Sequence, residues 1–184
     1  KVPKIFKGGT IIDDYYNVLH YCDESLYNFI ENSKKESWYP NTLFIIVTDH
    51  TNRLPKDRKN YEIKRHWIPC LLYGPALKEE YVGKTIDFPA SHIDFAATIL
   101  AQLGLKHDKY VWSKNIFNSN YNNKWAFYTF DEGFGFLQNN DKIVFDAKLN
   151  KLSVKNNNKI DDTLNLRGKV LLQKLLDDYI ELSK

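Results

Sequence analysis

The first half of the chain alternates between apolar residues at helical spacing and short runs that are apolar throughout. Over residues 13–33, apolar side chains recur every three or four positions, which predicts an amphipathic helix with one face for a core. Thr42–Val47 and Trp67–Tyr73 are continuous apolar runs, as in strands that are covered on both faces. Such strands are typical of parallel sheets, so we predict an α/β fold with a mixed, mostly parallel sheet and helices on both faces.

A second helix is predicted over residues 91–103, because its apolar side chains again fall on one face. Ser91 and Asp94 have the spacing of a capping box, in which each side chain accepts a hydrogen bond from the other residue's backbone N–H. Gly104 suits the left-handed position at which many helices end. We expect this helix and the first one to cover the sheet.

The pattern changes after Trp112, where short segments of strand character replace the long helices. Short antiparallel strands are predicted at Trp125–Phe130, Gly135–Gln138 and Lys142–Asp146, with a hairpin turn at residues 139–141. The Asn-rich residues 151–159 predict a loop, and helical spacing returns over Asp161–Leu182. The second half therefore predicts a small carboxyl-terminal antiparallel sheet and a closing helix.

Length and charge limit the class of protein. A chain of 184 residues is most simply one domain, which we divide into an α/β core portion, residues 1–110, and the small sheet with its closing helix, residues 111–184. The 26 basic and 23 acidic residues are interspersed and give a net charge of +3. This balance does not indicate a nucleic-acid partner, because such proteins carry a clustered basic surface.

The remaining composition adds two expectations. No apolar run approaches the roughly 18 residues that indicate a membrane-spanning helix, so we expect this stretch of chain to be soluble. Cys22 and Cys70 are too few for a disulfide framework. Since each falls within an apolar pattern, we predict that both are small buried hydrophobes.

Asp49 and His50 directly follow the first predicted strand and give the strongest chemical signal in the sequence. In open α/β sheets, ligands bind beyond the carboxyl ends of the strands. A carboxylate and an imidazole supply one oxygen and one nitrogen ligand, which suit zinc or manganese. The alternative is structural: Asp49 caps a following helix, and His50 is a surface histidine.

Several motifs then occur in an order that is similar to one known superfamily. An apolar strand ends in Asp49-His50, a second strand runs from Trp67-Ile-Pro to Gly74-Pro75, and a helix begins Ser-x-x-Asp-x-x-x-Thr-Ile-Leu at Ser91. This order, over residues 15–105, resembles the carboxyl-terminal half of the alkaline phosphatase superfamily in its sulfatase and lipoteichoic acid synthase branch. Lys1-Val-Pro and Ala126–Gly135 resemble segments of bacterial sulfatase-like proteins in that branch.

The resemblance implies a metal-dependent hydrolase or transferase that acts on phosphate or sulfate esters. In that superfamily one or two divalent metals activate a threonine, serine or formylglycine nucleophile, and Asp49 and His50 match its Asp-His metal ligands. Zinc, manganese and calcium all stay open as the metal. His66, Thr51 and Asn52 are candidates for substrate contact. The alternatives are a solvent-facing strand end for His66 and simple turn formation for the other two.

A group of aromatic residues in the second half has two interpretations. The group comprises Phe127, Tyr128, Phe130, Phe134 and Phe136. These side chains either line a groove for a lipid or a sugar, or pack the small sheet against the main one. We favour packing, because large aromatic side chains commonly fill cores.

The same resemblance implies that the chain carries only part of a catalytic apparatus. In the family, the nucleophile and at least one acidic ligand precede the position that Lys1 matches. We therefore expect a carboxyl-terminal fragment whose metal site is incomplete, and which alone binds metal poorly and catalyses nothing. The full-length protein is expected to act outside the cytoplasm, anchored by upstream membrane helices. Its expected partners are an anionic ester substrate and the missing amino-terminal part of the same protein.

A second hypothesis comes from another class of protein, a non-catalytic α/β module that acts in binding or scaffolding. The two hypotheses differ in the sequence that would precede Lys1. A threonine or serine beside an upstream acidic ligand supports the enzyme, and its absence supports the module.

Overall fold

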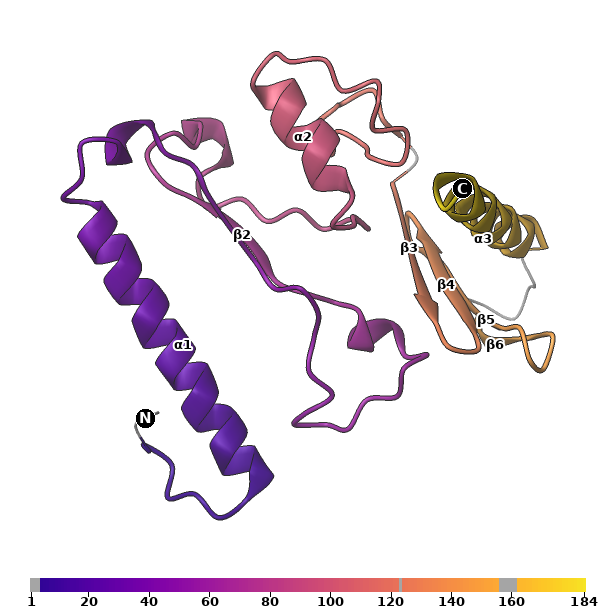
Figure 1. The fold of residues 1–184 in the computed structure, drawn as a ribbon, viewed down its shortest axis with the longest axis horizontal. Helices are drawn as coiled ribbons and strands as arrows, with labels where there is room; N and C mark the ends of the chain where they lie inside the picture. Colours follow the sequence, from indigo (N-terminus) through magenta and orange to yellow (C-terminus); the bar gives the residue numbers. More distant parts are fainter. Residues whose placement is uncertain (1–3, 123, 156–161) are drawn as a thin grey trace. The chain divides into compact units, whose positions relative to one another are not determined.

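A computed structural model describes residues 4–122, 124–155 and 162–184. The backbone forms two compact units, Lys1–Thr85 and Ile86–Lys184, named here the amino-terminal unit and the carboxyl-terminal unit. Figure 1 shows the helices and strands of both, labelled in chain order. The structure combines helices with separate sheets, so the predicted α/β class is confirmed, including the small carboxyl-terminal antiparallel sheet and the closing helix.

In the amino-terminal unit, α1 spans Ile11–Ser33, so the first predicted helix is confirmed with an earlier start. Its amino end is capped by Thr10, whose hydroxyl oxygen accepts a hydrogen bond from the backbone N–H of Asp13 at 3.1 Å. Phe29, near the other end, packs edge-on against Phe44 with ring centroids 6.0 Å apart. This aromatic contact joins α1 to the first strand.

The two predicted apolar strands are neighbours, but their direction differs from the prediction. β1, Phe44–Val47, and β2, Cys70–Tyr73, form a two-stranded sheet in which Phe44 pairs with Tyr73. The pairing is antiparallel, so the predicted parallel arrangement is wrong for this pair. The strands are also half-buried or exposed, where burial on both faces was predicted. A continuous apolar run shows that both faces are apolar, and it carries no information about chain direction or about what covers those faces.

Short 3₁₀ helices lie in the connections of this unit. Among the described residues they are η1, Tyr39–Asn41; η2, Ile63–Arg65; and η3, Glu79–Tyr81. η2 lies in the long connection between β1 and β2, just before the second strand. It therefore sets the position of the residues that lead into β2.

In the carboxyl-terminal unit, α2 spans Asp94–Gln102 and confirms the second predicted helix, with a later start. Half of the predicted capping box is present, since the Asp94 carboxylate accepts a hydrogen bond from the Ser91 backbone N–H at 2.9 Å. The Asp94 N–H donates instead to the Ser91 carbonyl oxygen at 3.0 Å. Gly104 has a φ of 69°, the predicted left-handed conformation at the end of the helix. Whether α2 covers the sheet of β1 and β2 stays a prediction.

A four-stranded antiparallel sheet follows, with the strands in chain order. The strands are β3, Trp125–Phe130; β4, Gly133–Gln138; β5, Asp141–Asp146; and β6, Lys151–Lys155. The first three confirm the prediction. The predicted loop over residues 151–159 is wrong for residues 151–155, and the rest of it lies outside the described residues. Polar composition favoured a loop, but an edge strand keeps polar side chains while its backbone pairs with β5.

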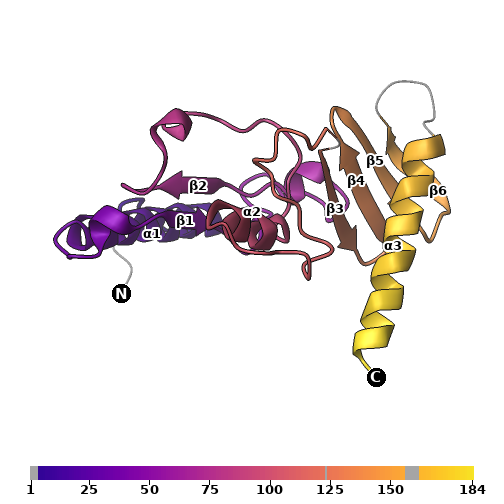
Figure 2. The same cartoon turned by 90° about the horizontal axis from the view of Figure 1, so that it is seen from above.

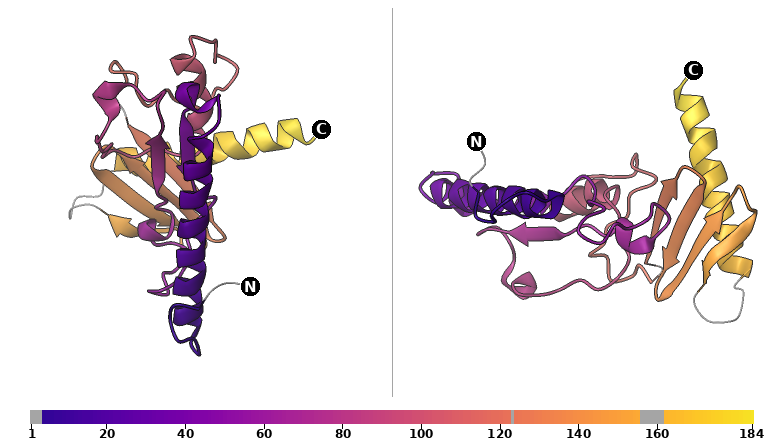
Figure 3. Two further views of the ribbon diagram at one scale, coloured as in Figure 1. Left: turned by 90° about the vertical axis from the view of Figure 1, so that its left-hand side faces the viewer. Right: turned by 90° about the horizontal axis from the view of Figure 1, so that it is seen from below.

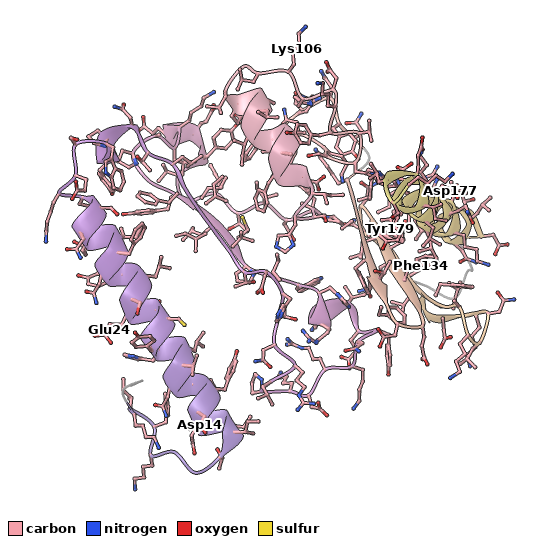
Figure 4. All side chains as sticks on the ribbon, viewed as in Figure 1. Asp14, Glu24, Lys106, Phe134, Asp177 and Tyr179 are labelled. Atoms are coloured by element: carbon pink, nitrogen blue, oxygen red, sulfur yellow. The ribbon has the colours of Figure 1, made fainter. Side chains whose placement is uncertain are left out.

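α3, Asp162–Leu182, lies across one face of this sheet, as Figures 2 and 3 show. The core between them comprises Phe134, Phe136, Ile143, Phe145 and Leu164. Gly168 allows α3 to approach closely, because a Cβ there would lie 2.3 Å from the Cε2 atom of Phe134, which Figure 4 labels. The closing helix α3 and the four-stranded sheet therefore pack against each other as two layers.

Three of the five aromatic residues singled out in β3 and β4 lie in or against this core. Phe134 and Phe136 are buried, and the ring of Phe127 stacks on Phe134 with centroids 5.4 Å apart. Their packing partner is α3, through Leu164 and the neighbouring Leu171 and Leu172. These three residues therefore have a packing role, with α3 as the partner. Packing against the sheet of β1 and β2 stays a prediction.

Cys22 and Cys70 are both exposed, so the prediction that they are buried is wrong. Cys22 does lie on an apolar side of α1, but the neighbouring Val18 and Leu19 are about half exposed as well. Apolar spacing identified the face correctly and could not identify a partner for it. Among the described residues, no helix is long and apolar enough to cross a membrane.

Candidate metal centre

Asp49 and His50 lie in the turn that follows β1, as the sequence predicted. Both side chains are open to solvent, with exposed fractions of 86% and 76%. The backbone N–H of His50 donates to Oδ1 of Asp49 at 2.8 Å, which holds the carboxylate over the turn. Oδ2 of Asp49 points toward the imidazole, and its distance to Nε2 of His50 is 3.4 Å.

The other ring nitrogen of His50 contacts the backbone. Nδ1 lies 3.0 Å from the carbonyl oxygen of Thr51, and because a carbonyl only accepts, Nδ1 carries the proton in this contact. In the neutral imidazole, Nε2 then has a lone pair. Metal-ligating histidines commonly donate their other N–H to a carbonyl in this way, which fixes the tautomer and the ring orientation.

The spacing of the two donors fits one shared ion. Two ligands at about 2.1 Å from a tetrahedral zinc ion stand roughly 3.4 Å apart. The separation of Nε2 of His50 from Oδ2 of Asp49 is 3.4 Å. One oxygen and one nitrogen at this spacing match half of a tetrahedral shell. Within the described ranges, no cluster of three or more His, Cys, Asp or Glu residues is close enough to complete it.

Thr51, which follows the pair, is held by Arg65 from the far end of the connecting loop. The Thr51 hydroxyl donates to the carbonyl oxygen of Arg65. The Nη1 atom of Arg65 in turn donates to the Thr51 carbonyl oxygen, and to the Thr51 hydroxyl oxygen at 2.7 Å. These bonds close the loop between residues 52 and 64 at its base. The carbonyl of Thr51 that contacts His50 is therefore itself fixed.

Arg65 is a residue that sequence reasoning missed. Its partner Thr51 is distant in the sequence, and no local pattern connects the two. The available signal was a basic residue directly before the second apolar strand, beside His66. The structure shows that this residue supports the turn that carries the candidate ligands.

The other two candidates for substrate contact have backbone partners. Asn52 accepts a hydrogen bond from the backbone N–H of Leu54 at 3.0 Å, the turn-forming role that was its alternative. The Nε2 atom of His66 lies 2.7 Å from the carbonyl oxygen of Asn60, to which it donates. Burial lowers the pKa of His66, partly opposed by that hydrogen bond. None of these contacts tests whether Asn52, Thr51 or His66 touches a substrate.

Comparison with known proteins identifies the class of this chain. Residues 2–105, more than half of the chain, match the Sulfatase family model. The chain therefore belongs to the Sulfatase family. The matched region contains Asp49, His50 and both strands of the amino-terminal unit.

Particular relatives agree with the predicted branch. The chain is 27% identical over 121 residues to lipoteichoic acid synthase 2 of Bacillus subtilis (strain 168), covering 58% of this chain and 18% of that protein. A crystal structure of a protein in the alkaline phosphatase superfamily from Vibrio parahaemolyticus superposes with a TM-score of 0.69 and 22% identity, covering 91% of this chain and 42% of that one. The resemblance to the sulfatase and lipoteichoic acid synthase branch is confirmed. The chain spans less than half the length of either relative.

Proposed function

We propose that this chain forms part of a metal-dependent enzyme of the sulfatase family, in which Asp49 and His50 are two ligands of a divalent metal ion. Membership of the family supports action on phosphate or sulfate esters as a hydrolase or transferase. The observation that carries the proposal is the 3.4 Å spacing of Nε2 of His50 and Oδ2 of Asp49 beyond the end of β1. Zinc, manganese and calcium are the candidate ions, and an oxygen–nitrogen pair favours zinc or manganese over calcium.

The residues of this chain have separate tasks in the proposed site. Oδ2 of Asp49 and Nε2 of His50 bind the ion, the His50 N–H orients the carboxylate, and the Thr51 carbonyl orients the imidazole. A divalent ion bound there supplies Lewis acidity and stabilises negative charge on the oxygens of the transferring group. Because the imidazole must be neutral to bind a metal, affinity should fall at acidic pH. Thr51, Asn52 and His66 belong to the loop that we place beside the substrate.

In this proposal, catalysis by the whole protein also requires groups that this chain does not supply. A nucleophile and further metal ligands would come from the amino-terminal part of the same protein, which is also a structural partner of this chain. We place the whole protein outside the cytoplasm, anchored to a membrane by helices of that part. The likeness to lipoteichoic acid synthase 2 supports this placement.

Metal content tests the proposal directly. The intact protein with Asp49→Ala or His50→Ala should lose bound metal, measured by mass spectrometry of the dialysed protein. It should also lose more than about a hundredfold in activity, since even groups that only orient a ligand cost 10–100-fold. His20→Ala is the matched control, because His20, which lies on α1, is an exposed histidine like His50. Unchanged metal content in both site variants would contradict the assignment.

A second candidate function is a non-catalytic α/β binding or scaffolding module. The observation that favours it is the lack of a group of three metal-ligating side chains among the described residues. Both candidates predict that the 184-residue chain alone shows no phosphatase, phosphodiesterase or sulfatase turnover with added zinc, manganese or calcium. Turnover by the chain alone that His50→Ala abolishes would show that the site is complete here. The intact protein separates the candidates, because only the enzyme turns over an ester.

A further inference from the structure

α3 carries a second apolar surface on the side that is turned away from the sheet. This outer stripe comprises Leu166, Val170, Leu176 and Ile180, whose exposed fractions are 62%, 58%, 45% and 55%. Leu164 and Gly168, on the opposite side of the helix, are buried against the sheet. Scattered single apolar residues are ordinary on a surface, but a row at helical spacing indicates a face that packs against another element.

The outer stripe is symmetric about Gln173. Its positions pair as Leu166 with Ile180, Lys169 with Asp177, and Val170 with Leu176, which stand seven, four and three residues before and after Gln173. Lys169, Gln173 and Asp177 are exposed like the stripe itself. In a two-fold interface, residue i meets residue j and residue j meets residue i. Two copies of α3 that cross antiparallel at Gln173 therefore bring apolar residues onto apolar residues and lysine onto aspartate.

Charge along the helix favours the same direction. Beyond Asp162, Arg167 and Lys169 precede Gln173, whereas Asp177, Asp178 and Glu181 follow it together with one lysine, Lys174. Antiparallel pairing places the positive half of one copy beside the negative half of the other and aligns the helix dipoles favourably. Parallel pairing would place like charges together.

Some of these charges already have partners within one copy. Nη1 of Arg167 donates to Oε1 of Gln138 at 2.7 Å, and Lys174 pairs with Asp178. The Nζ atom of Lys169 lies 4.3 Å from the centroid of the Phe145 ring. Lys169 must therefore leave Phe145, or reach past it, to contact a partner's aspartate. This competition makes the ion pairs a source of direction and register rather than of affinity.

We propose that the outer stripe is a homodimer contact, in which α3 packs antiparallel against α3 of a second copy with both Gln173 residues near the two-fold axis. Gln173 donates from Nε2 to Oδ1 of Asp177 at 2.8 Å within its own copy, so the centre of the stripe is polar. A polar position at the centre of a helix seam is a device that fixes register. The contact is independent of the metal site and of any reaction.

The size of the contact sets the expected strength. One helix pair buries less than the roughly 1,200 Å² that marks the lower limit of stable interfaces. The dimer should therefore be reversible, with a dissociation constant in the micromolar range. Sedimentation equilibrium of the 184-residue chain across that range should show a monomer–dimer equilibrium.

Substitutions on the stripe test its role. Ile180→Glu should reduce the association constant by about tenfold or more, because it places a charge in the apolar seam twice per dimer. Tyr179→Glu is the matched control: Tyr179 is 69% exposed on the same turn of α3, lies off the stripe, and is labelled in Figure 4 together with Asp177. It should leave the association constant unchanged. Far-UV circular dichroism should show that both variants keep the helix.

Charge reversal tests direction and register. Lys169→Asp alone and Asp177→Lys alone each set like charges together across the two-fold axis, so each variant should associate more weakly than the parent chain. Mixing the two variants should restore a dimer, since one copy then carries two aspartates where the other carries two lysines. The restored dimer should contain one copy of each, which native mass spectrometry can resolve.

The outcomes distinguish a second copy of this chain from other partners of the outer stripe. A chain that stays monomeric at hundreds of micromolar overturns the proposal. It is overturned equally if such a monomer binds phospholipid vesicles or the rest of the protein through the stripe. Association that Ile180→Glu does not weaken also overturns it, because a different surface is then responsible. Failure of the two charge variants to pair on mixing overturns the antiparallel register.

Discussion

The two compact units bury their apolar residues to very different extents. In the carboxyl-terminal unit, Phe134, Phe136 and Val144 are almost completely buried. In the described part of the amino-terminal unit, Ile30 is the one hydrophobic residue in the buried class, although β1 and β2 are as apolar as any segment of the chain. The same kind of sequence has thus produced a closed core in one unit and open strands in the other.

The difference follows from how each unit obtains neighbours for its strands. β3 to β6 are consecutive and joined by short turns, so each strand pairs with the next one along the chain, and α3 then covers one face. Among the described residues, β1 and β2 pair with each other and with no further strand, and the aromatic contact of Phe29 with Phe44 is a small cover for two apolar faces. A strand that is apolar on both faces forms a core only when elements are available for both.

The largest expected effect compares one phenylalanine from each unit. Phe134→Ala should destabilise the carboxyl-terminal unit by about 3–5 kcal/mol, because it leaves a cavity in a dense core. Phe44→Ala should cost the amino-terminal unit only about 1–2 kcal/mol, because Phe44 is half-buried and its loss removes part of the transfer free energy. Hydrogen exchange measured on peptides of each unit gives the two free energies separately. Equal losses would remove the contrast between the units.

A second prediction concerns the buried polar contact of the carboxyl-terminal unit. Asp94 is 2% exposed, and its Oδ1 atom lies 2.7 Å from Nζ of Lys114, which in turn lies 3.6 Å from the centroid of the Trp125 ring. Asp94→Ala should cost about 3 kcal/mol, because it leaves a buried ammonium without its anion. Asp108→Ala, at an exposed carboxylate of the same unit, should change stability by less than about 0.5 kcal/mol.

The pH dependence of the Asp94→Ala variant sharpens that result. Burial lowers the pKa of Lys114, and the Asp94 carboxylate opposes this shift. Without Asp94 the pKa falls further, so over a wider range below the ordinary lysine pKa the unfolded chain binds a proton that the folded chain lacks. The stability of the variant should therefore rise as pH increases toward 10. A variant whose stability loss is the same from pH 7 to pH 10 would mean that Lys114 is solvated after the substitution.

The same contrast explains which parts of the structure the sequence could predict. The helices over residues 13–33, 91–103 and 161–182 were found because helical periodicity is local to each segment. The direction of β1 relative to β2 could not be found, because it depends on the path of the long loop between them. β6 was missed because an edge strand can keep polar side chains that look like a loop.

Within the candidate site, the sequence again predicted local features and missed contacts between residues that are distant along the chain. Asp49 and His50 were found because a strand end is visible in the sequence. The hydrogen bonds between Thr51 and Arg65 were not, because they join the two ends of a loop. The contact of His50 with the Thr51 carbonyl depends on side-chain rotamer, which no pattern of residue types encodes.

A smaller effect is expected for a substitution on the open strands. Leu71 pairs with Ile46 across the two-stranded sheet and is 54% exposed. Leu71→Ser should therefore change the stability of the 184-residue chain by less than about 1 kcal/mol in urea denaturation. A loss of several kcal/mol would show that Leu71 is covered in solution, for example by self-association. The difference in burial between the two units would then hold only for a single isolated copy of the chain.

The smallest effect concerns Asp178, on the exposed flank of α3. Hydrogen bonds from Lys174 and from the indole N–H of Trp112, the latter at 2.9 Å, hold the pKa of Asp178 below its ordinary value. A carboxyl group with a lowered folded-state pKa adds stability above its unfolded pKa, and this contribution is lost as pH falls through the folded value. Asp178→Asn should thus lower the midpoint temperature slightly at pH 7, and the difference from the parent should shrink as the pH falls below about 4. Trp112→Phe, which removes one of the two donors, should show a part of the same pH dependence. A difference between parent and Asp178→Asn that persists unchanged at pH 3 would show that packing, and not the charge of Asp178, ties α3 to the loop that carries Trp112.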